Sequence, residues 1–136
     1  ATDTSYEGQK VIKYYESTDG TNWQFVRDIH LIYQYGGKTF TPWHIDVIDN
    51  DGVYMMCIMC KGEYYVLFKA TSNDNITYST PSILMVPNDY SWDSVMYRSC
   101  FVKVGNLFRL YYSSNGTQKG IGISESADGE KFYGLI

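Results

Sequence analysis

The sequence lacks any apolar run that approaches the roughly 20 residues needed to span a bilayer. It also lacks an excess of positive charge. Its 11 Lys and Arg residues are outnumbered by 15 Asp and Glu residues, which gives a net charge of −4 and a pI near 5.0. Proteins that bind DNA or RNA draw much of their affinity from a basic surface. We therefore expect neither a membrane span nor a nucleic-acid partner.

Cysteine is scarce, and the three cysteines form no complete disulfide framework because their number is odd. Cys57 and Cys60 form a C-x-x-C pair inside the apolar run 53–60, which is typical of a buried strand. Residues three apart on a strand point to opposite faces, so this pair is poorly placed to share a metal ion or a redox bond. We expect both cysteines, and Cys100, to be core thiols. No metal and no cofactor are expected.

The composition favours one folded β domain. With 136 residues, a single domain is the natural expectation. Hydrophobic residues make up 44% and aromatic residues 17%, which is enough to fill a core. Fourteen tyrosines, with Val and Ile in short runs, favour strands, and almost no helical periodicity is present.

One turn pattern, Ser-x-Asp-(Gly or Asn)-x-x-aromatic, occurs three times. It begins at Ser17, Ser72 and Ser126, which stand 55 and 54 residues apart (72 − 17 and 126 − 72). Asp and Gly favour turns because Asp bonds to its own backbone and Gly accepts positive φ. We interpret six residues as structural turn residues: Ser17, Asp19, Ser72, Asp74, Ser126 and Asp128.

A repeat of about 54 residues with four short strands per unit is the signature of a β-propeller blade. The middle unit predicts strands at 43–48, 53–60, 64–72 and 76–86, and the third at 95–102, 107–114, 120–126 and 131–136. The first unit shows only its second half, at 10–17 and 23–33. A β-sandwich is the alternative, but it does not predict the same turn chemistry at a fixed interval.

The predicted fold is therefore all-β and propeller-like, with four-stranded antiparallel blades. Its blade portions lie at about 9–35, 42–89 and 93–136, which makes roughly two and a half blades where closed propellers have four to eight. An open arc would leave edge strands with unpaired backbone groups. We expect 1–136 to be one domain within a larger propeller, or to associate with itself or with another chain so that the edges are covered.

The three turns resemble the Asp-box of sialidase-like propellers. The shorter spacing here is closer to the five-bladed clan of glycoside hydrolase families 43, 32 and 62. Two stretches carry the same resemblance: "PWHIDVI" (42–48) and "YRSCFVKVGNLFRLYYSSNGTQKGIGISESADG" (97–129). The resemblance implies a glycan or polysaccharide partner and favours an extracellular or cell-surface location.

Candidate site residues come from the strands expected to line the propeller channel, 43–48 and 95–102. His44 and Asp46 share one face of the first strand. A His and an Asp in an apolar strand are costly to bury unpaired. Either they tie adjacent blades together, or Asp46 is a catalytic carboxylate beside a substrate-binding His44.

Further binding candidates lie on or near the second of these strands. Arg98 either pairs with Asp46 or binds a substrate through its planar fork. We expect Asp46, His44 and Arg98 to converge near the propeller axis. The candidate stacking platforms for sugar rings are Trp43, Trp92 and Tyr97, although large aromatic residues more often belong to the core.

Hydrolysis of a glycosidic bond needs two carboxyl groups, roughly 5–5.5 Å or 6.5–9.5 Å apart. The two expected channel strands offer Asp46 and no glutamate, so the general-acid Glu of the clan has no counterpart here. Three hypotheses follow: a glycoside-hydrolase-like segment that acts on carbohydrate, a non-catalytic module that recognises a carbohydrate or receptor, and a structural interaction propeller. The resemblance supports carbohydrate more strongly than it supports catalysis.

Overall fold

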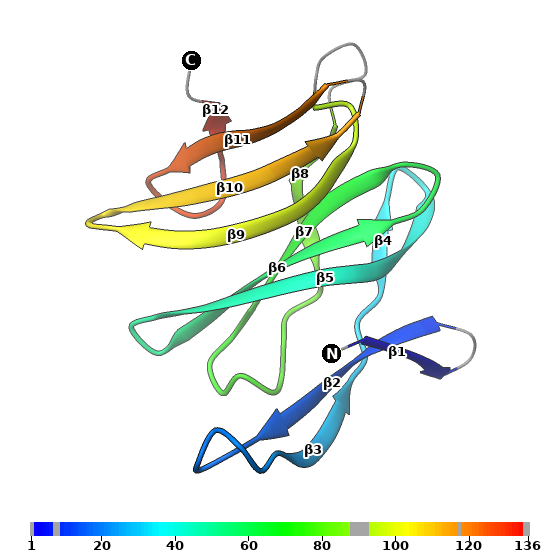
Figure 1. Ribbon diagram of the computed structural model, residues 1–136, viewed down its shortest axis with the longest axis vertical. Helices are drawn as coiled ribbons and strands as arrows, with labels where there is room; N and C mark the ends of the chain where they lie inside the picture. The colour runs from blue at the N-terminus through cyan, green and yellow to red at the C-terminus, as the bar shows by residue number, and fades with distance from the viewer. Residues whose placement is uncertain (1, 7–8, 88–92, 117, 135–136) are drawn as a thin grey trace.

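The computed structural model describes residues 2–6, 9–87, 93–116 and 118–134, and this part of the chain is all-β (Figure 1). It contains no helix, and therefore none that is long and apolar enough to cross a membrane. The strands are β1 (Thr2–Tyr6), β2 (Gln9–Glu16), β3 (Gln24–Ile29), β4 (Tyr33–Tyr35), β5 (Lys38–Asn50), β6 (Val53–Lys61), β7 (Tyr65–Ser72), β8 (Ser82–Met85), β9 (Met96–Val104), β10 (Leu107–Asn115), β11 (Lys119–Ser126) and β12 (Tyr133–Gly134).

These strands form three antiparallel sheets, each a meander in chain order. The first sheet is β1-β2-β3, the middle sheet is β4-β5-β6-β7-β8, and the third sheet has the order β12-β11-β10-β9. Figure 1 shows the sheets stacked along the long axis of the molecule, with the middle sheet between the other two. The fold is thus a propeller-like repeat of antiparallel blades.

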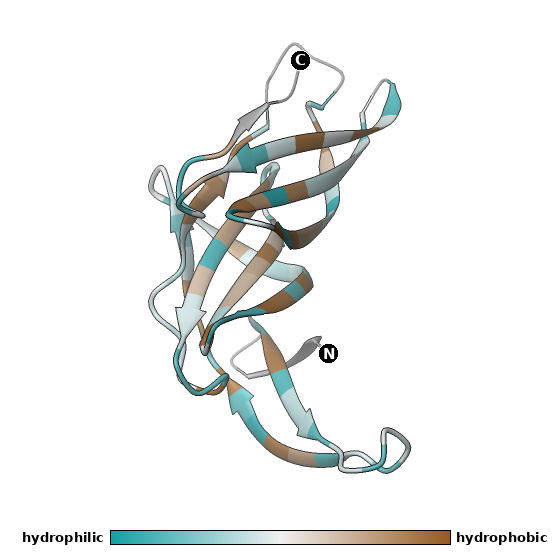
Figure 2. Cartoon of the chain, turned by 90° about the vertical axis from the view of Figure 1, so that its left-hand side faces the viewer, coloured by the Kyte–Doolittle hydropathy of each residue, from teal (hydrophilic) through white to brown (hydrophobic). Residues whose placement is uncertain are grey.

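The hydrophobic core lies on both faces of the middle sheet. On β6, Ile58 and Cys60 are fully buried in the cluster shared with the first sheet, which includes Ile12. Cys57 and Met59, which alternate with them, are buried in the cluster shared with the third sheet. Figure 2 shows the resulting apolar colour along the central strands. The C-x-x-C pair therefore points to opposite faces, as its spacing predicted.

The middle sheet has one strand more than the four we expected for a blade. β5 begins at Lys38, and β4 pairs with it through Tyr33↔Phe40 and Tyr35↔Lys38. Gly36 and Gly37, both at positive φ (57° and 74°), form the two-residue turn between them. This conformation matches the twist of a hairpin and costs glycine nothing.

The strand expected at 76–86 is shorter than the sequence suggested. Only Ser82–Met85 is β-structured, as β8. The preceding segment bonds to β7 irregularly instead: Ser79 N donates to the Thr71 carbonyl at 2.8 Å, and Thr71 N donates to Ser79 Oγ at 3.0 Å. Pro81, which has no N–H to give to a ladder, stands just before β8.

The three repeated turns share one hydrogen-bond arrangement. In the first, the Thr21 and Asn22 N–H groups donate to Asp19 Oδ1 at 2.8 and 2.7 Å. Asp74 accepts the equivalent bonds from residues 76 and 77, and Asp128 from residues 130 and 131. These bonds favour the ionised carboxylate, so they lower the pKa of Asp19 and Asp74, and hold that of Asp128 at about 2.

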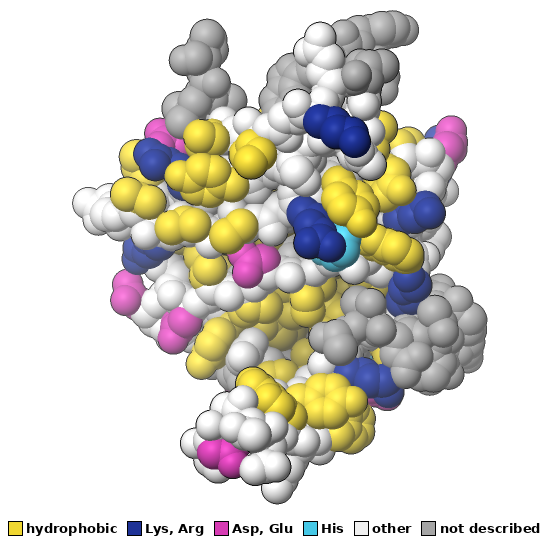
Figure 3. Space-filling view, viewed as in Figure 1, with side chains coloured by type: hydrophobic (Ala, Val, Ile, Leu, Met, Phe, Trp, Pro, Cys, Tyr) yellow, Lys and Arg dark blue, Asp and Glu magenta, His cyan; other side chains and the backbone are white. Residues whose placement is uncertain are grey.

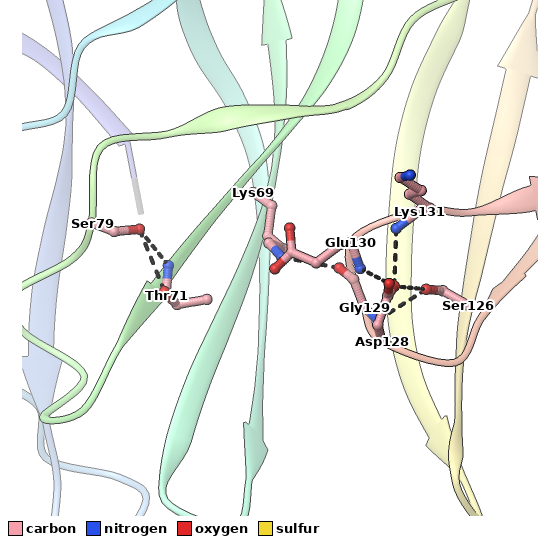
Figure 4. A network of polar contacts seen from close by, with 8 residues as sticks. All are labelled: Lys69, Thr71, Ser79, Ser126, Asp128, Gly129, Glu130 and Lys131. Carbon is pink, nitrogen blue, oxygen red and sulfur yellow. Dashed lines mark hydrogen bonds and ion pairs between the residues drawn. The ribbon is translucent and has the colours of Figure 1, made fainter.

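A buried lysine joins the middle and third sheets (Figure 4). Lys69 of β7 is 5% exposed, and its Nζ donates to the Gly129 carbonyl at 3.0 Å. It also pairs with Glu130 in the same turn. The third turn is thereby docked on the preceding blade, so this turn stabilises the packing between two blades as well as its own backbone.

The outer face of the third sheet is open in the described chain. Ile121 of β11 is 73% exposed, whereas Leu67, which holds the same place on β7, is fully buried. The two residues are 54 positions apart, one repeat. The middle sheet buries its face against a neighbouring blade, and the third sheet presents the corresponding face to solvent.

Candidate functional site

The candidate site lies where β5 and β9 run beside each other at equivalent positions of two blades. The turn between β5 and β6 follows the pair Asn50↔Val53, and the turn between β9 and β10 follows the pair Val104↔Leu107. The two turns are 54 residues apart, which is one repeat. By this register His44 corresponds to Arg98, and Trp43 to Tyr97. The residues that sequence reasoning selected are therefore structural equivalents.

Both strands carry a β-bulge at this point. On β5, Pro42 pairs with Cys60 and His44 with Met59, so Trp43 is an extra residue without a partner. On β9, two residues, Tyr97 and Arg98, stand opposite the single residue 113 of β10. Bulges redirect side chains and occur often beside functional sites. The repeat thus places two redirected pairs of side chains next to each other.

The side chains of the two bulges are in contact. The His44 and Tyr97 rings meet edge to face, with centroids 5.1 Å apart, and the Trp43 ring lies 6.2 Å from His44. The Arg98 guanidinium carbon is 5.6 Å from the Tyr97 ring centroid. We call Trp43, His44, Tyr97 and Arg98 the bulge cluster.

The His44 imidazole is the unsatisfied member of the bulge cluster. Its Nε2 atom is buried and has no hydrogen-bond partner among the described residues. Burial is the main cause that lowers its pKa, and the charges of Arg98 and Lys10 act in the same direction. The ring is therefore neutral near pH 7, with a polar atom whose bonding capacity the described chain leaves unused.

Asp46 makes a contact between blades. Its Oδ2 accepts a hydrogen bond from the Phe101 backbone N–H at 2.7 Å, which ties β5 to β9. Its negative charge also contributes, after burial, to the raised pKa of the Cys100 thiol. The structure brings His44 and Arg98 together around Tyr97, while Asp46 is engaged further along β9. This geometry corresponds to the blade-tying alternative.

Trp92 and Asp93 precede β9 along the chain. Trp92 lies outside the described residues. Asp93 accepts a hydrogen bond from the Tyr112 hydroxyl at 3.1 Å. Burial and this neighbouring carboxylate raise the pKa of Tyr112 to about 12.

Cys100 is exposed, so our expectation of a core thiol was wrong for this residue. Cys100 on β9 is equivalent to Asp46 on β5, one repeat of 54 residues earlier. Asp46 faces the sheet that follows its own along the chain, where it bonds to Phe101, so Cys100 faces the same way from the third sheet. The third sheet has no described neighbour on that side. Cys57 and Cys60 are buried, as expected.

Sequence reasoning missed two lysines that belong to the site. Lys10 Nζ lies 3.5 Å from the Trp43 ring centroid, and Lys61 Nζ lies 5.4 Å from it. Lys61 stands opposite residue 41 in the β5–β6 ladder, a pairing that the sequence does not reveal. The sequence shows only that Lys61 follows an apolar run, which does not reveal its contact with Trp43.

Among the described residues, no group of three or more His, Cys, Asp and Glu side chains could hold a metal ion. A separate cleft of about 410 Å³ lies between the first and middle sheets. It is lined mainly by apolar and aromatic side chains, including Ile12, Trp23 and Tyr78. It is distinct from the bulge cluster and contains none of its four residues.

No known family profile matches the chain. Two curated proteins of Mycobacterium tuberculosis, the uncharacterized proteins MT1551 and Rv1502, are each 28% identical to it over 118 residues. That match covers 84% of this chain and 39% of each relative. The chain thus spans well under half the length of the curated relatives it matches.

Several solved structures with the same fold are named as carbohydrate-acting enzymes. A family 117 glycoside hydrolase of the marine bacterium Zobellia galactanivorans superposes with a TM-score of 0.71 at 17% identity, covering 93% of this chain and 41% of that one. The GH32 β-fructofuranosidase of Bombyx mori gives a TM-score of 0.72 at 12% identity, covering 97% and 29%. An N-acetylgalactosamine deacetylase from F. plautii, solved with blood group B trisaccharide, gives 0.67 at 24% identity, covering 84% and 36%.

These similarities define the class of fold. The chain has the propeller fold found in glycoside hydrolases, and its three sheets correspond to part of each larger protein.

Proposed function

We propose that this chain is a saccharide-binding segment of a carbohydrate-acting propeller protein, and that the bulge cluster is its binding site. The observation that carries the proposal is the buried His44 Nε2 atom, which has no partner among the described residues. A buried polar group without a hydrogen bond costs about 1–3 kcal/mol, and a sugar hydroxyl would supply the missing bond. The carbohydrate-acting proteins that share the fold support this reading.

The chemistry of the cluster suits a sugar. Trp43 is 37% exposed and offers an aromatic face for the C–H groups of a pyranose or furanose ring. Arg98 is exposed and presents a planar fork of donors for hydroxyl or carboxylate oxygens. A sugar has both an apolar face and a rim of hydroxyls, so it can engage the ring and the fork together.

Binding rather than hydrolysis is the role we assign to this segment. Asp46 Oδ2 accepts a hydrogen bond from the Phe101 N–H, and none of the four residues of the bulge cluster carries a carboxylate. A glycosidase needs two carboxyl groups at defined separation. The second candidate function is that of an enzyme. The curated relatives are longer than the part that this chain matches, and in this second case the catalytic acids would come from the corresponding additional length of a longer protein. The glycoside hydrolases that share the fold favour that candidate.

The test is a binding measurement on matched variants. Isothermal titration with mono- and oligosaccharides should show binding that His44→Ala and Arg98→Ala each weaken by about tenfold. The melting temperature should change little for Arg98→Ala, because the side chain is exposed. Arg27→Ala, an exposed arginine on the first sheet, is the control and should bind as the parent does. Equal binding by all variants, or a large loss of stability in Arg98→Ala, would contradict the proposal.

A further inference from the structure

Three cations, one inside the bulge cluster and two beside it, have no carboxylate partner among the described residues. Lys10, Lys61 and Arg98 form no ion pair with any residue that the structure describes. Of the eight other Lys and Arg residues, five pair with acids: Lys13, Lys38, Lys69, Lys103 and Arg109. Arg27, Lys119 and Lys131 form no such pair among the described residues, so the feature specific to the cluster is that three unpaired cations gather at one place on an acidic chain with a net charge of −4.

The three cations are held by aromatic rings of the cluster. Lys10 Nζ lies 3.5 Å and Lys61 Nζ 5.4 Å from the centroid of the Trp43 ring. The Arg98 guanidinium carbon lies 5.6 Å from that of Tyr97. Cation–π contacts position a charge without neutralising it, unlike a salt bridge. Figure 3 shows Lys and Arg side chains beside a histidine and apolar side chains on this face.

The field at His44 is accordingly positive. Burial lowers the pKa of its imidazole most, Arg98 and Lys10 lower it further, and no carboxylate among the described residues acts in the opposite direction. Asp46, the nearest acid along β5, is bonded to the backbone of β9. A neutral imidazole can still donate or accept one hydrogen bond at Nε2. The site thus combines a ring platform, one uncharged polar atom and three positive charges that form no ion pair with a described residue.

We propose that the preferred ligand of the bulge cluster is an acidic saccharide, whose carboxylate or sulfate group is bound by Arg98, Lys10 and Lys61 while its ring stacks on Trp43. This inference rests on the proposed function and narrows it from saccharides in general to anionic ones. Arginine binds carboxylate and sulfate oxygens in pairs, and such charge-assisted bonds are about twice as strong as neutral ones. A neutral sugar would leave the three cations without an anionic partner.

The two sources of the anion, a uronic acid and a sulfate ester, are separated by the choice of probes. Isothermal titration of the parent chain uses four: an oligogalacturonide, a sulfated galactan oligosaccharide, a neutral galactan oligosaccharide of equal length, and polyglutamate. We expect at least one acidic saccharide to bind about tenfold more tightly than the neutral one. Its affinity should fall as salt rises from 0.05 to 0.5 M, because exposed charges are screened.

Variants then assign the charge to its residues. Arg98→Ala should weaken binding of the acidic saccharide by about tenfold, and Lys10→Gln and Lys61→Gln each by about two- to fivefold. None of the three should change binding of the neutral oligosaccharide as much. Arg27→Ala and Lys119→Gln, which remove exposed cations elsewhere, are the controls and should preserve the preference. Circular dichroism and melting curves confirm that each variant is folded.

The outcomes distinguish the preference for acidic saccharides from the proposed saccharide-binding function. Tighter binding of the oligogalacturonide or of the sulfated oligosaccharide supports it and identifies the anion. Equal affinity for acidic and neutral saccharides overturns it, while the saccharide site stands. Binding of no saccharide overturns both proposals. Binding of polyglutamate as tight as that of the acidic saccharides also overturns it, since charge alone would then explain the affinity.

Discussion

Lys69 of the middle sheet donates a hydrogen bond to the Gly129 carbonyl of the third sheet, 3.0 Å away, from a side chain that is only 5% exposed. The contact fixes the third repeated turn against the blade before it. A lysine in this position is unusual, since charged side chains are seldom fully buried without a partner. Here the partners are a backbone carbonyl and the exposed Glu130.

Replacement of Lys69 by methionine should destabilise the fold by about 1–3 kcal/mol, because the Gly129 carbonyl loses its donor while the volume of the side chain is nearly kept. Urea unfolding measures the change. Lys119→Met, an exposed lysine of β11, is the matched control and should lie close to the parent. An unchanged midpoint in Lys69→Met would show that the contact contributes nothing to stability.

Addition of a methyl group at Gly122 should also destabilise the third sheet. A Cβ atom there would lie 2.3 Å from Cζ of the Tyr112 ring, which is itself buried. We expect Gly122→Ala to cost about 1–3 kcal/mol through overpacking. In a Tyr112→Leu background, the same change should cost less, because the ring that it strikes is gone. A purely additive double mutant would refute this explanation.

The turn carboxylates should make the fold less stable in acid. Hydrogen bonds from backbone N–H groups hold the pKa of Asp128 at about 2, below the ordinary value of 3.8. The stabilisation is therefore complete above the unfolded pKa and is lost as the pH falls through the folded one, between about pH 4 and 2. Unfolding curves at several pH values should show a smaller decline for Asp128→Asn. An identical decline would rule out this contribution.

The three cysteines should differ in reactivity. Burial raises the pKa of Cys57 to about 12 and also raises that of Cys60, whereas Cys100 is exposed. Iodoacetamide should modify one thiol of the native chain, at Cys100, and all three in denaturant. Asp46→Asn should accelerate the native reaction, since the Asp46 charge helps to raise the Cys100 pKa. Mass spectrometry identifies the modified site, and native labelling of Cys57 or Cys60 would contradict the buried geometry.

The blade repeat was predictable because turn chemistry is local. Ser17, Asp19 and their later counterparts bond within five residues of chain, so spacing alone reveals them. The alternation of β6 was predictable for the same reason, since a strand has a period of two. β4 was missed although a signal was present: Gly36-Gly37, flanked by aromatic residues, is a two-residue hairpin turn.

The candidate site was predictable only in part. His44 and Arg98 were selected as polar interruptions of apolar strands, and the one-repeat register does bring them together. Lys10 and Lys61 could not be selected, because their contact with Trp43 depends on a bulge and on how two sheets pack. Asp46 was a reasonable catalytic candidate from its strand position. Its bond to Phe101 N is a contact over 55 residues that no local pattern records.

The cleft between the first and middle sheets has a consequence for how the molecule opens. The first sheet packs on its neighbour through Ile12 and Ile29, beside a space of about 410 Å³. The third sheet has in addition the buried Lys69 clamp and the Asp46 bond. In stacked repeats, the weaker seam separates first. Amide protons of β2 and β3 should therefore exchange with deuterium before those of β6 and β10. The free energy needed to separate a terminal sheet from the middle sheet then differs between the two ends of the repeat.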